Sequence, residues 1–560
     1  MRSALPGAGM TVITLLVAFL VLYPLSMLLY GSFRTSRPGA PGSFTLQNYI
    51  EAYTSVETLR LLLTTILLMG AKTVVATVVA MALAFALTRT DTPLRSLLEV
   101  LIAMPFFIPP ILEAIGWIML LSPRTGTINV ALGQLFGSSM PRFSIYSLGG
   151  MIWVLSLGST AFMFLLLVNA LRNIDTSLEE AARVAGASPL RVATRVTLPL
   201  VAPAILGVSL LSFIRALESF EVPVLIGLPA KVFVFPNRIY AAVEQDYPPN
   251  YGLATALGVS FILLTLGLVV LQGRILRGKQ FFVISGKSYR PQVAKIGPAK
   301  YLICVLCFSY FLVATLLPLS QLLLGSVSRT FGRWSWAGLT LANYSRVLAD
   351  SQLWAGLRNT LLLGLTAAAL SMVLCSLVAY IVTRTRYPAR KSLDFISWIP
   401  WTIPGVVVGL GMLWAYIRFP IPIYGTMVLI GIAFVTSGLP LGVRLMSGVM
   451  VQIDTELEES SRVHGAGWAT TYRRILLPLL RPAMAAGIII LFVTFARSLS
   501  SIVFLAGPGT PMLSVVLFKY FSTSNLEIVC ALAMIMLAIN VTGLVLARRL
   551  GFFGSARASV

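Results

Sequence analysis

The sequence predicts an all-α membrane protein that consists of two parallel six-helix repeats. Three observations support this fold class. The chain of 560 residues is 57% hydrophobic and 11% charged, whereas soluble domains carry about 25% charged residues. Apolar runs of about 20 residues, long enough to cross a bilayer as helices, recur along the chain. A polar stretch also occurs twice with the same internal spacing.

Hydropathy predicts twelve membrane helices. The first six cover residues 10–30, 58–87, 95–121, 146–171, 200–225 and 252–272, and the second six cover residues 300–324, 356–382, 393–417, 424–448, 480–505 and 526–547. The first run has the length of a signal peptide. Its Tyr23-Pro24-Leu25-Ser26 recurs as Leu317-Pro318-Leu319-Ser320 deep in the chain, so we expect a retained helix.

Matching residues define the two repeats. Thr88-Arg89-Thr90 recurs as Thr383-Arg384-Thr385, and Pro105 and Pro109 recur as Pro400 and Pro404, where the helix pair could shape a constriction. We therefore predict a first repeat at 1–272, a basic linker at 273–299 and a second repeat at 300–560. An even number of spans gives both repeats the same orientation. The first repeat carries an insertion around residues 122–144.

The charge pattern sets the expected orientation. The net charge is +23, but the basic residues lie in short loops rather than on a water-facing domain, which argues against a nucleic-acid partner. The larger share of Lys and Arg falls on one side if both termini are cytoplasmic, as the positive-inside rule requires. The four cysteines lie in apolar runs, and Cys304-x-x-Cys307 has no second pair, so we expect helix packing rather than a metal site.

The repeated polar stretch lies in one predicted cytoplasmic loop of each repeat, at about 172–199 and about 449–478. In the first copy Glu180-Ala181-Ala182 is followed by Gly186 and, nine residues later, by a Val-x-Leu-Pro exit ending at Pro199. Each loop is predicted to form two short helices around a turn, with the glycine in a left-handed conformation and the proline at re-entry to the membrane. Thr176-x-x-Glu179 and Thr455-x-x-Glu458 fit a capping box.

This motif resembles the EAA loop of permease subunits of binding-protein-dependent ABC importers. The resemblance covers nearly the whole chain and implies two fused permeases with the type I importer (MetI-like) fold. It also implies that each loop docks a coupling helix on an ATPase subunit. The second copy departs from the motif, with Ser460-Ser461 for Ala-Ala. The docking residues so implied are Glu180, Ala181, Ala182, Gly186, Pro199, Glu459, Ser460, Ser461, Gly465 and Pro478.

The resemblance also implies the partners, and the chain lacks the motif that an ATPase would need. It contains no G-x-x-x-x-G-K-[ST] phosphate loop. We therefore expect no enzymatic activity and no cofactor in this chain, with ATP and Mg²⁺ bound by a separate, homodimeric ABC ATPase on the cytoplasmic side. An extracytoplasmic binding protein would deliver the solute. The expected location is the lipid bilayer of a bacterial inner membrane, crossed many times. His464, the single histidine, is expected at a surface or docking position.

Ionisable residues inside membrane helices are functional candidates, because each costs about 2.5–3.5 kcal/mol to insert. The candidates for the transport pathway or its gate are Arg215, Glu218, Glu221, Arg497 and Glu113. Glu218 aligns with Arg497, so we hypothesise that these two pair between the repeats. The alternative is a local pair of Arg215 with Glu218, three residues apart on one helix.

The substrate is the least constrained prediction. Glu218-Ser219-Phe220-Glu221-Val222-Pro223 resembles the fused permeases assigned to ferric iron uptake. Related permeases carry thiamine, polyamines, phosphonates or sulfate. No residue set resembles an iron cage, so the binding protein would have to coordinate iron. A twelve-helix secondary transporter is the alternative class, but it would not require paired docking loops.

Overall fold

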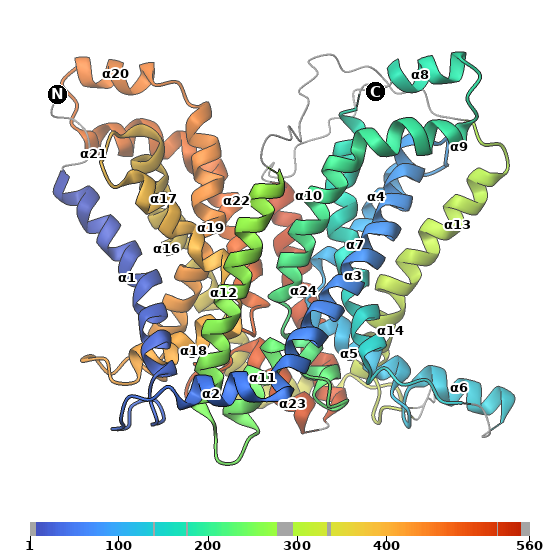
Figure 1. The fold of residues 1–560 in the computed structure, drawn as a ribbon, viewed down its shortest axis with the longest axis horizontal. Coiled ribbons are helices and arrows are strands. Elements are labelled where there is room, and N and C mark those ends of the chain that lie inside the picture. The colour runs from blue at the N-terminus through green and yellow to red at the C-terminus, as the bar shows by residue number, and fades with distance from the viewer. Residues whose placement is uncertain are drawn as a thin grey trace. The chain divides into compact units, whose positions relative to one another are not determined.

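The computed structural model describes residues 7–137, 141–174, 177–276, 295–332, 338–523 and 525–549. Within these ranges the fold is helical, with isolated β-bridges at Arg34–Phe44 and Ser328–Leu339 (Figure 1). Ten helices are long and apolar enough to cross a membrane, and two bent helix pairs raise the number of spans to twelve. The all-α fold class is confirmed, and the described residues hold ten to twelve spans, which agrees with the predicted twelve if each bent pair is one span; several helix ends differ.

The helices of the two repeats follow one another along the chain. The first set is α1 (Gly7–Ser32), α2 (Gln47–Thr54), α3 (Val56–Arg89), α4 (Arg95–Ala103), α5 (Pro110–Leu121), α6 (Thr127–Phe136), α7 (Leu148–Arg172), α8 (Ser177–Val184), α9 (Pro189–Val192), α10 (Leu198–Leu217), α11 (Phe235–Glu244) and α12 (Tyr251–Leu276). The second set is α13 (Ala299–Phe311), α14 (Leu317–Ser326), α15 (Ala342–Ala349), α16 (Ser351–Arg384), α17 (Arg390–Trp398), α18 (Gly405–Tyr416), α19 (Met427–Gln452), α20 (Glu456–Val463), α21 (Trp468–Thr471), α22 (Leu477–Ala496), α23 (Leu513–Ser522) and α24 (Leu526–Arg549).

The third span of each repeat is bent, which corrects the prediction of single helices at 95–121 and 393–417. Helices α4 and α5 meet at 96°, and α17 and α18 meet at 110°. Proline disfavours helical backbone in the residue before it. Ile108 before Pro109 has ψ 131°, and Ile403 before Pro404 has ψ 125°. The repeated prolines therefore break these spans, and each second half begins immediately after the proline.

The helices form two compact units. Unit 1 contains Met1–Ser55, Arg238–Ile262 and Thr340–Val560, and unit 2 contains Val56–Asn237 and Leu263–Leu339. In unit 1, α1 packs on α18, and in unit 2, α14 packs on α5. Each unit therefore joins the first span of one repeat to later helices of the other. The predicted repeat boundaries describe the sequence and do not reveal this exchange.

Glycines allow both of these helix contacts. A side chain at Gly411 would lie 2.8 Å from the carbonyl oxygen of Pro24, and one at Gly116 would lie 2.7 Å from that of Pro318. Small residues let membrane helices approach closely where no hydrophobic force between helices operates. The same contact is therefore built once in each unit, from equivalent residues of the two repeats.

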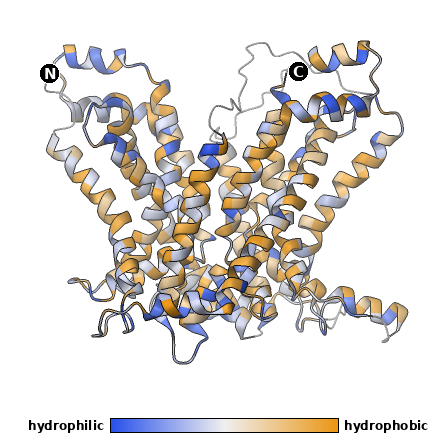
Figure 2. Cartoon of the chain, viewed as in Figure 1, coloured by the Kyte–Doolittle hydropathy of each residue, from blue (hydrophilic) through white to orange (hydrophobic). Residues whose placement is uncertain are grey.

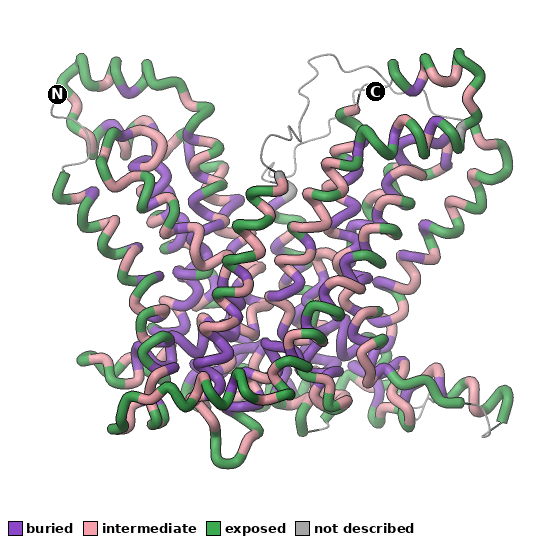
Figure 3. Tube along the Cα trace, in the orientation of Figure 1, coloured by how far each residue is buried: buried purple, intermediate pink, exposed green. Residues whose placement is uncertain are grey.

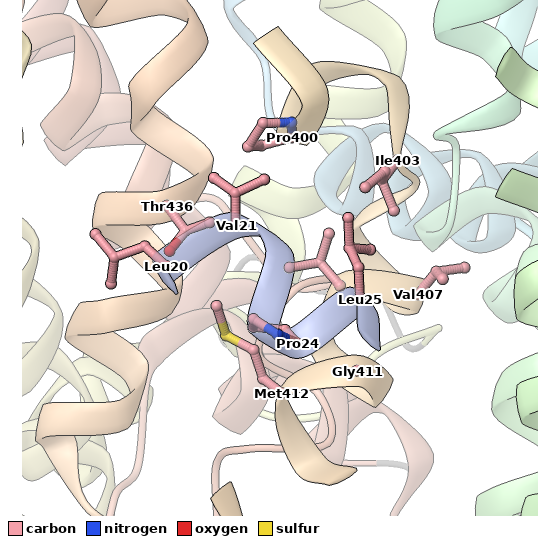
Figure 4. A pocket seen from close by; sticks show the side chains of 11 residues that line it. Leu20, Val21, Pro24, Leu25, Pro400, Ile403, Val407, Gly411, Met412 and Thr436 are labelled. Carbon is pink, nitrogen blue, oxygen red and sulfur yellow. The ribbon is translucent and has the colours of Figure 1, made fainter. Parts of the chain in front are cut away.

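The long helices consist largely of apolar residues (Figure 2), and they carry both buried and exposed residues (Figure 3). Exposed examples on α3 are Leu63 and Val78. A helix that is apolar all round suits a membrane. Unit 1 also holds a small pocket where α1 crosses α18 and α19 (Figure 4). Thr436 is the one polar side chain lining it, so this pocket does not suit a charged solute.

Candidate docking loops and transport pathway

The first docking loop presents one exposed helix face. In α8, Leu178, Ala181 and Val184 are exposed, and Val184 retains 90% of its accessible surface. The equivalent positions of α20, Leu457, Ser460 and Val463, are exposed too. Exposed apolar residues at matching places indicate a contact surface.

Sequence reasoning named Ala181 and Ser460 but missed the two larger side chains on each face. Leu178 recurs as Leu457, and Val184 recurs as Val463. This recurrence of apolar residues in two polar loops was the sequence signal that could have indicated the exposed faces. The structure places Glu459 at the surface and leaves Glu180 and Ala182 half-buried. His464 is exposed, and its Nδ1 lies 2.8 Å from the carbonyl oxygen of Ser460.

Both loop glycines have the left-handed conformation expected from the sequence. Their φ angles are +83° at Gly186 and +79° at Gly465. In the first loop the Gly186 N–H donates to the Arg183 carbonyl at 2.9 Å, and the Ala187 N–H donates to the Ala182 carbonyl at 3.0 Å. These two bonds end α8 in the manner of a Schellman motif.

The predicted second short helix of each loop is present, as α9 and α21, but it is not separate from the membrane helix that follows. Helix α9 continues through a π-helical turn, Ala193–Thr197, into α10, so that Leu190–Leu217 forms one span. Trp468–Ala496 does the same in the second copy, with the π turn at Tyr472–Leu476. Proline lacks the N–H that an α-helix would need, and a π turn accommodates this irregularity. Pro199 and Pro478 therefore lie inside continuous helices that begin well before them.

The predicted capping box is also wrong in the second loop. Thr455 is the N-cap of α20, but its side chain makes no capping hydrogen bond. Thr176 of the first loop lies outside the described residues. Both glutamates of the predicted boxes, Glu179 and Glu458, are buried instead.

Glu179 forms a buried ion pair with Arg89. Arg89 Nε lies 3.0 Å from Glu179 Oε1, and both side chains are 2% exposed. The Thr197 hydroxyl donates to the same carboxylate oxygen at 2.9 Å, and Arg89 Nη2 donates to the Leu171 carbonyl at 2.9 Å. This group joins the ends of α3 and α7 to α8 and to the π turn before α10.

The second loop repeats the pair with weaker geometry. Arg384 Nε lies 3.5 Å from Glu458 Oε1, beyond ordinary hydrogen-bond distance. Arg384 also donates to the carbonyls of Met450, at 2.5 Å, and Ile453. Leu476 occupies the position of Thr197 and supplies no hydroxyl.

Aromatic side chains hold the second loop in addition. The ring centroids of Trp468 and Tyr472 are 5.2 Å apart, and those of Tyr380 lie 5.9 and 6.1 Å from them. The Tyr472 and Ser376 hydroxyls are 2.7 Å apart. Ser461, which departs from the motif, lies 2.9 Å from the Thr471 hydroxyl.

Four pathway candidates gather around one cavity of unit 2. Glu113, Arg215, Glu218 and Glu221 line a space of ≈ 680 Å³ that opens to solvent, with Ser159 beside them. Arg497 belongs to unit 1, so its pairing with Glu218 stays a prediction. Arg215 lies 5.6 Å from the centre of the Phe162 ring. Among the described residues Arg215 and Glu218 line the same cavity but form no direct ion pair, so the predicted local pair is not observed as a contact.

Lys72 adds a buried cation close to this cavity. It is 3% exposed and donates to the hydroxyls of Ser159, at 2.7 Å, and Ser212, at 3.3 Å. We call Lys72, Glu113, Arg215, Glu218 and Glu221 the polar cluster. The second repeat has no equivalent set of charged residues. The residues equivalent to Lys72, Glu113, Arg215, Glu218 and Glu221 are Ala367, Val408, Thr494, Arg497 and Ser500. The polar cluster is therefore specific to the first repeat.

Comparison with known families decides the identity of the chain. Residues 73–280 and 372–552 both match the family described as binding-protein-dependent transport system inner membrane component. The chain belongs to this family. It is therefore the membrane permease of an ABC importer and not its ATPase, and it crosses the inner membrane several times.

Three relatives show how far the similarity extends. The putative ferric transport system permease protein FbpB 1 of Haemophilus influenzae is 27% identical over 90% of this chain and 78% of its own length. The ferric transport system permease protein FbpB of Actinobacillus pleuropneumoniae is 28% identical over 90% and 72%. The probable ABC transporter permease protein y4fN of Sinorhizobium fredii is 30% identical over 75% and 74%. In a solved bacterial alginate ABC transporter, one chain aligns with a TM-score of 0.41 and 22% identity, over 48% of this chain and 92% of its own.

Proposed function

We propose that this permease imports ferric iron. The observation that carries the proposal is that two relatives named as ferric transport permeases match 90% of the chain. The cavity of unit 2 supports it, because Glu113, Glu218 and Glu221 line this space. Carboxylate oxygens are the ligands that hard cations prefer.

The cavity suits passage of a cation better than its storage. No three His, Cys, Asp or Glu side chains of the described chain lie close enough together to hold a metal ion. Lys72 and Arg215 place positive charge beside the carboxylates. A pathway needs binding that is favourable enough for entry and weak enough for release. Iron would therefore be coordinated by the binding protein and only pass the permease.

The proposal includes the partners and the orientation. Both docking loops and both termini face the cytoplasm, where a homodimeric ABC ATPase docks on the exposed faces of α8 and α20. The recurrence of these faces in both loops supports two equivalent partner subunits. An extracytoplasmic binding protein delivers the solute, and ATP-driven closure of the ATPase dimer changes the permease between inward-open and outward-open states.

The test is uptake by proteoliposomes that contain the permease, its ATPase and its iron-loaded binding protein. We expect accumulation of radioactive iron that requires ATP. Uptake driven by an ion gradient without the ATPase would show a secondary transporter instead. The E180K/E459K double variant should no longer co-purify with the ATPase. The control variant Glu51→Lys, at a surface residue outside the docking loops, should still co-purify with it.

Sulfate is the second candidate solute. The sulfate transport system permease protein CysT of Salmonella typhimurium is 28% identical over 40% of this chain, and Lys72 and Arg215 would suit an anion. Radioactive sulfate with its binding protein, in the same vesicles, distinguishes the two. Sulfate uptake without iron uptake would overturn the iron proposal and leave the ABC permease intact.

A further inference from the structure

We propose that Arg89 and Arg384 are positioning residues for energy coupling. Each fixes its docking loop to the end of a long membrane helix, α3 or α16, through the buried glutamate of the loop. This inference rests on the proposed docking of the ATPase to α8 and α20.

The buried carboxylate is the main point of attachment of each docking helix. Glu179 is the one buried residue of α8, and Glu458 is the one buried residue of α20. The opposite, apolar face of each helix is exposed. A movement imposed on that face by a partner must reach the membrane helices through the few contacts that hold the helix. In the first loop the charged one of those contacts is the buried ion pair with Arg89, at 3.0 Å.

The position of Arg89 suits this role. It is the last residue of α3, a helix of 34 residues that is long enough to cross the membrane. A rigid helix with two discrete arrangements is the physical element by which coupling between distant sites operates. Arg384 ends α16, also of 34 residues, in the same way. The two arginines therefore connect the docking surfaces to equivalent spans of the two repeats.

The two attachments depend on their arginines to different degrees. In the first loop the carboxylate accepts bonds from Arg89 and Thr197 at 3.0 and 2.9 Å. In the second loop the pair is longer, at 3.5 Å, and the Trp468–Tyr472–Tyr380 cluster adds contacts that need no charge. Loss of Arg89 should therefore loosen its loop more than loss of Arg384.

The first experiment measures loop mobility and needs no substrate. A spin label is attached to Val184→Cys or Val463→Cys, both highly exposed positions, in a permease whose four native cysteines are replaced. Arg89→Gln should increase the mobility of the label at 184 and leave the label at 463 unchanged. Arg384→Gln should increase the mobility of the label at 463, but by less than Arg89→Gln increases the mobility of the label at 184. Unchanged spectra in all variants would overturn the inference even if the chain imports iron.

The second experiment measures coupling in the complete transporter, as solute imported per ATP hydrolysed. Arg89→Gln should keep the ATPase bound and active but lower this ratio about tenfold, a typical size for coupling between sites. Arg89→Lys should retain most of the solute imported per ATP hydrolysed. The double exchange Arg89→Glu/Glu179→Arg should restore part of this ratio. Arg172→Gln, which removes an exposed ion pair with Glu99 at the end of α7, is the matched control and should change nothing.

The outcomes separate a positioning role from a merely structural one. If Arg89→Gln lowers uptake and ATP hydrolysis in proportion to the amount of folded protein, the arginine only stabilises the fold and the inference fails. If the unmodified chain binds no ATPase, the proposed function fails, and the mobility measurement still decides whether Arg89 and Arg384 hold the loops.

Discussion

The two docking loops hold equivalent glutamates in different ways. Glu179 is held by charge and hydrogen bonds, from Arg89 at 3.0 Å and Thr197 at 2.9 Å. Glu458 has a longer ion pair with Arg384, and an aromatic cluster supplements it. Both arrangements keep an exposed apolar face on a short helix. The two docking helices therefore have the same exposed face although different contacts hold their buried glutamates. Each repeat of one chain can change its own contacts independently.

The membrane parts of the repeats differ more strongly. The first repeat surrounds its cavity with Glu113, Arg215, Glu218 and Glu221 and buries Lys72 nearby. The second repeat has apolar or small polar residues at all but one of these positions. Because charged side chains in a membrane are costly, we propose from their presence in one repeat alone that the solute interacts mainly with that repeat.

The largest expected effect tests this difference directly. Lys72→Met should lower uptake at least about tenfold, because it removes a buried cation close to the carboxylates of the cavity, and ionisable groups inside membrane helices are functional candidates. Thermal stability should stay the same or rise, because a buried charge is removed. Ala367→Lys, at the equivalent buried position of the second repeat, should cost about 2.5–3.5 kcal/mol, measured as lost membrane abundance. If Lys72→Met and Ala367→Lys lowered uptake equally, with no loss of protein from the membrane, the proposed difference between the two repeats would be contradicted.

The second prediction concerns a place where the repeats agree. Gly116→Val and Gly411→Val should each destabilise the transporter by about 1–3 kcal/mol, the usual range for overpacking. The reason is that the new side chain would meet the backbone of Pro318 or Pro24. Gly70→Val is the control, because nothing lies within 4 Å of that position. Thermal unfolding in nanodiscs measures all three, and a tolerated Gly411→Val would show that unit 1 is packed more loosely than unit 2.

The sequence predicted what depends on local pattern. Twelve spans followed from hydropathy, and the left-handed Gly186 and Gly465 followed from helix-ending patterns. The bends before Pro109 and Pro404 were not predicted, because proline within a membrane span is tolerated where neighbours satisfy the backbone. The Thr-Arg-Thr repeat is visible in the sequence, but the contacts of its arginines are not.

Non-local contacts explain what remained hidden. Arg89 and Glu179 are 90 residues apart, and the charge pattern does not say which of many arginines meets a given glutamate. The exchange of first spans, which puts α1 on α18 and α14 on α5, was hidden for a similar reason. An apolar helix packs equally well on either repeat as far as hydropathy is concerned. The partners are distinguished by specific contacts, such as the facing Gly–Pro pairs and the hydrogen bond from the Tyr23 hydroxyl to the Ala415 carbonyl.

The third prediction compares the loop glycines. Gly186→Ala and Gly465→Ala should each destabilise their loop by about 1–2 kcal/mol, the cost of left-handed backbone in a residue with a side chain. Asparagine at either position should be tolerated better. ATP-driven uptake should fall more for Gly186→Ala, because the second loop keeps its aromatic contacts and the Ser461–Thr471 contact. Equal losses would mean that the differences between the loops have no functional consequence.

The smallest expected effect isolates a single hydrogen bond. Thr197→Val keeps the shape of the side chain and removes the donor to Glu179, which should cost about 1 kcal/mol, the typical net value of such a bond. Leu476→Thr offers the second loop the hydroxyl that it lacks and should recover part of this amount around Glu458. Label mobility at position 184 for the first variant, and at 463 for the second, measures the change. If Thr197→Val leaves mobility at 184 unchanged, Arg89 alone holds the first carboxylate, and the two attachments differ only in ion-pair length and in the aromatic cluster.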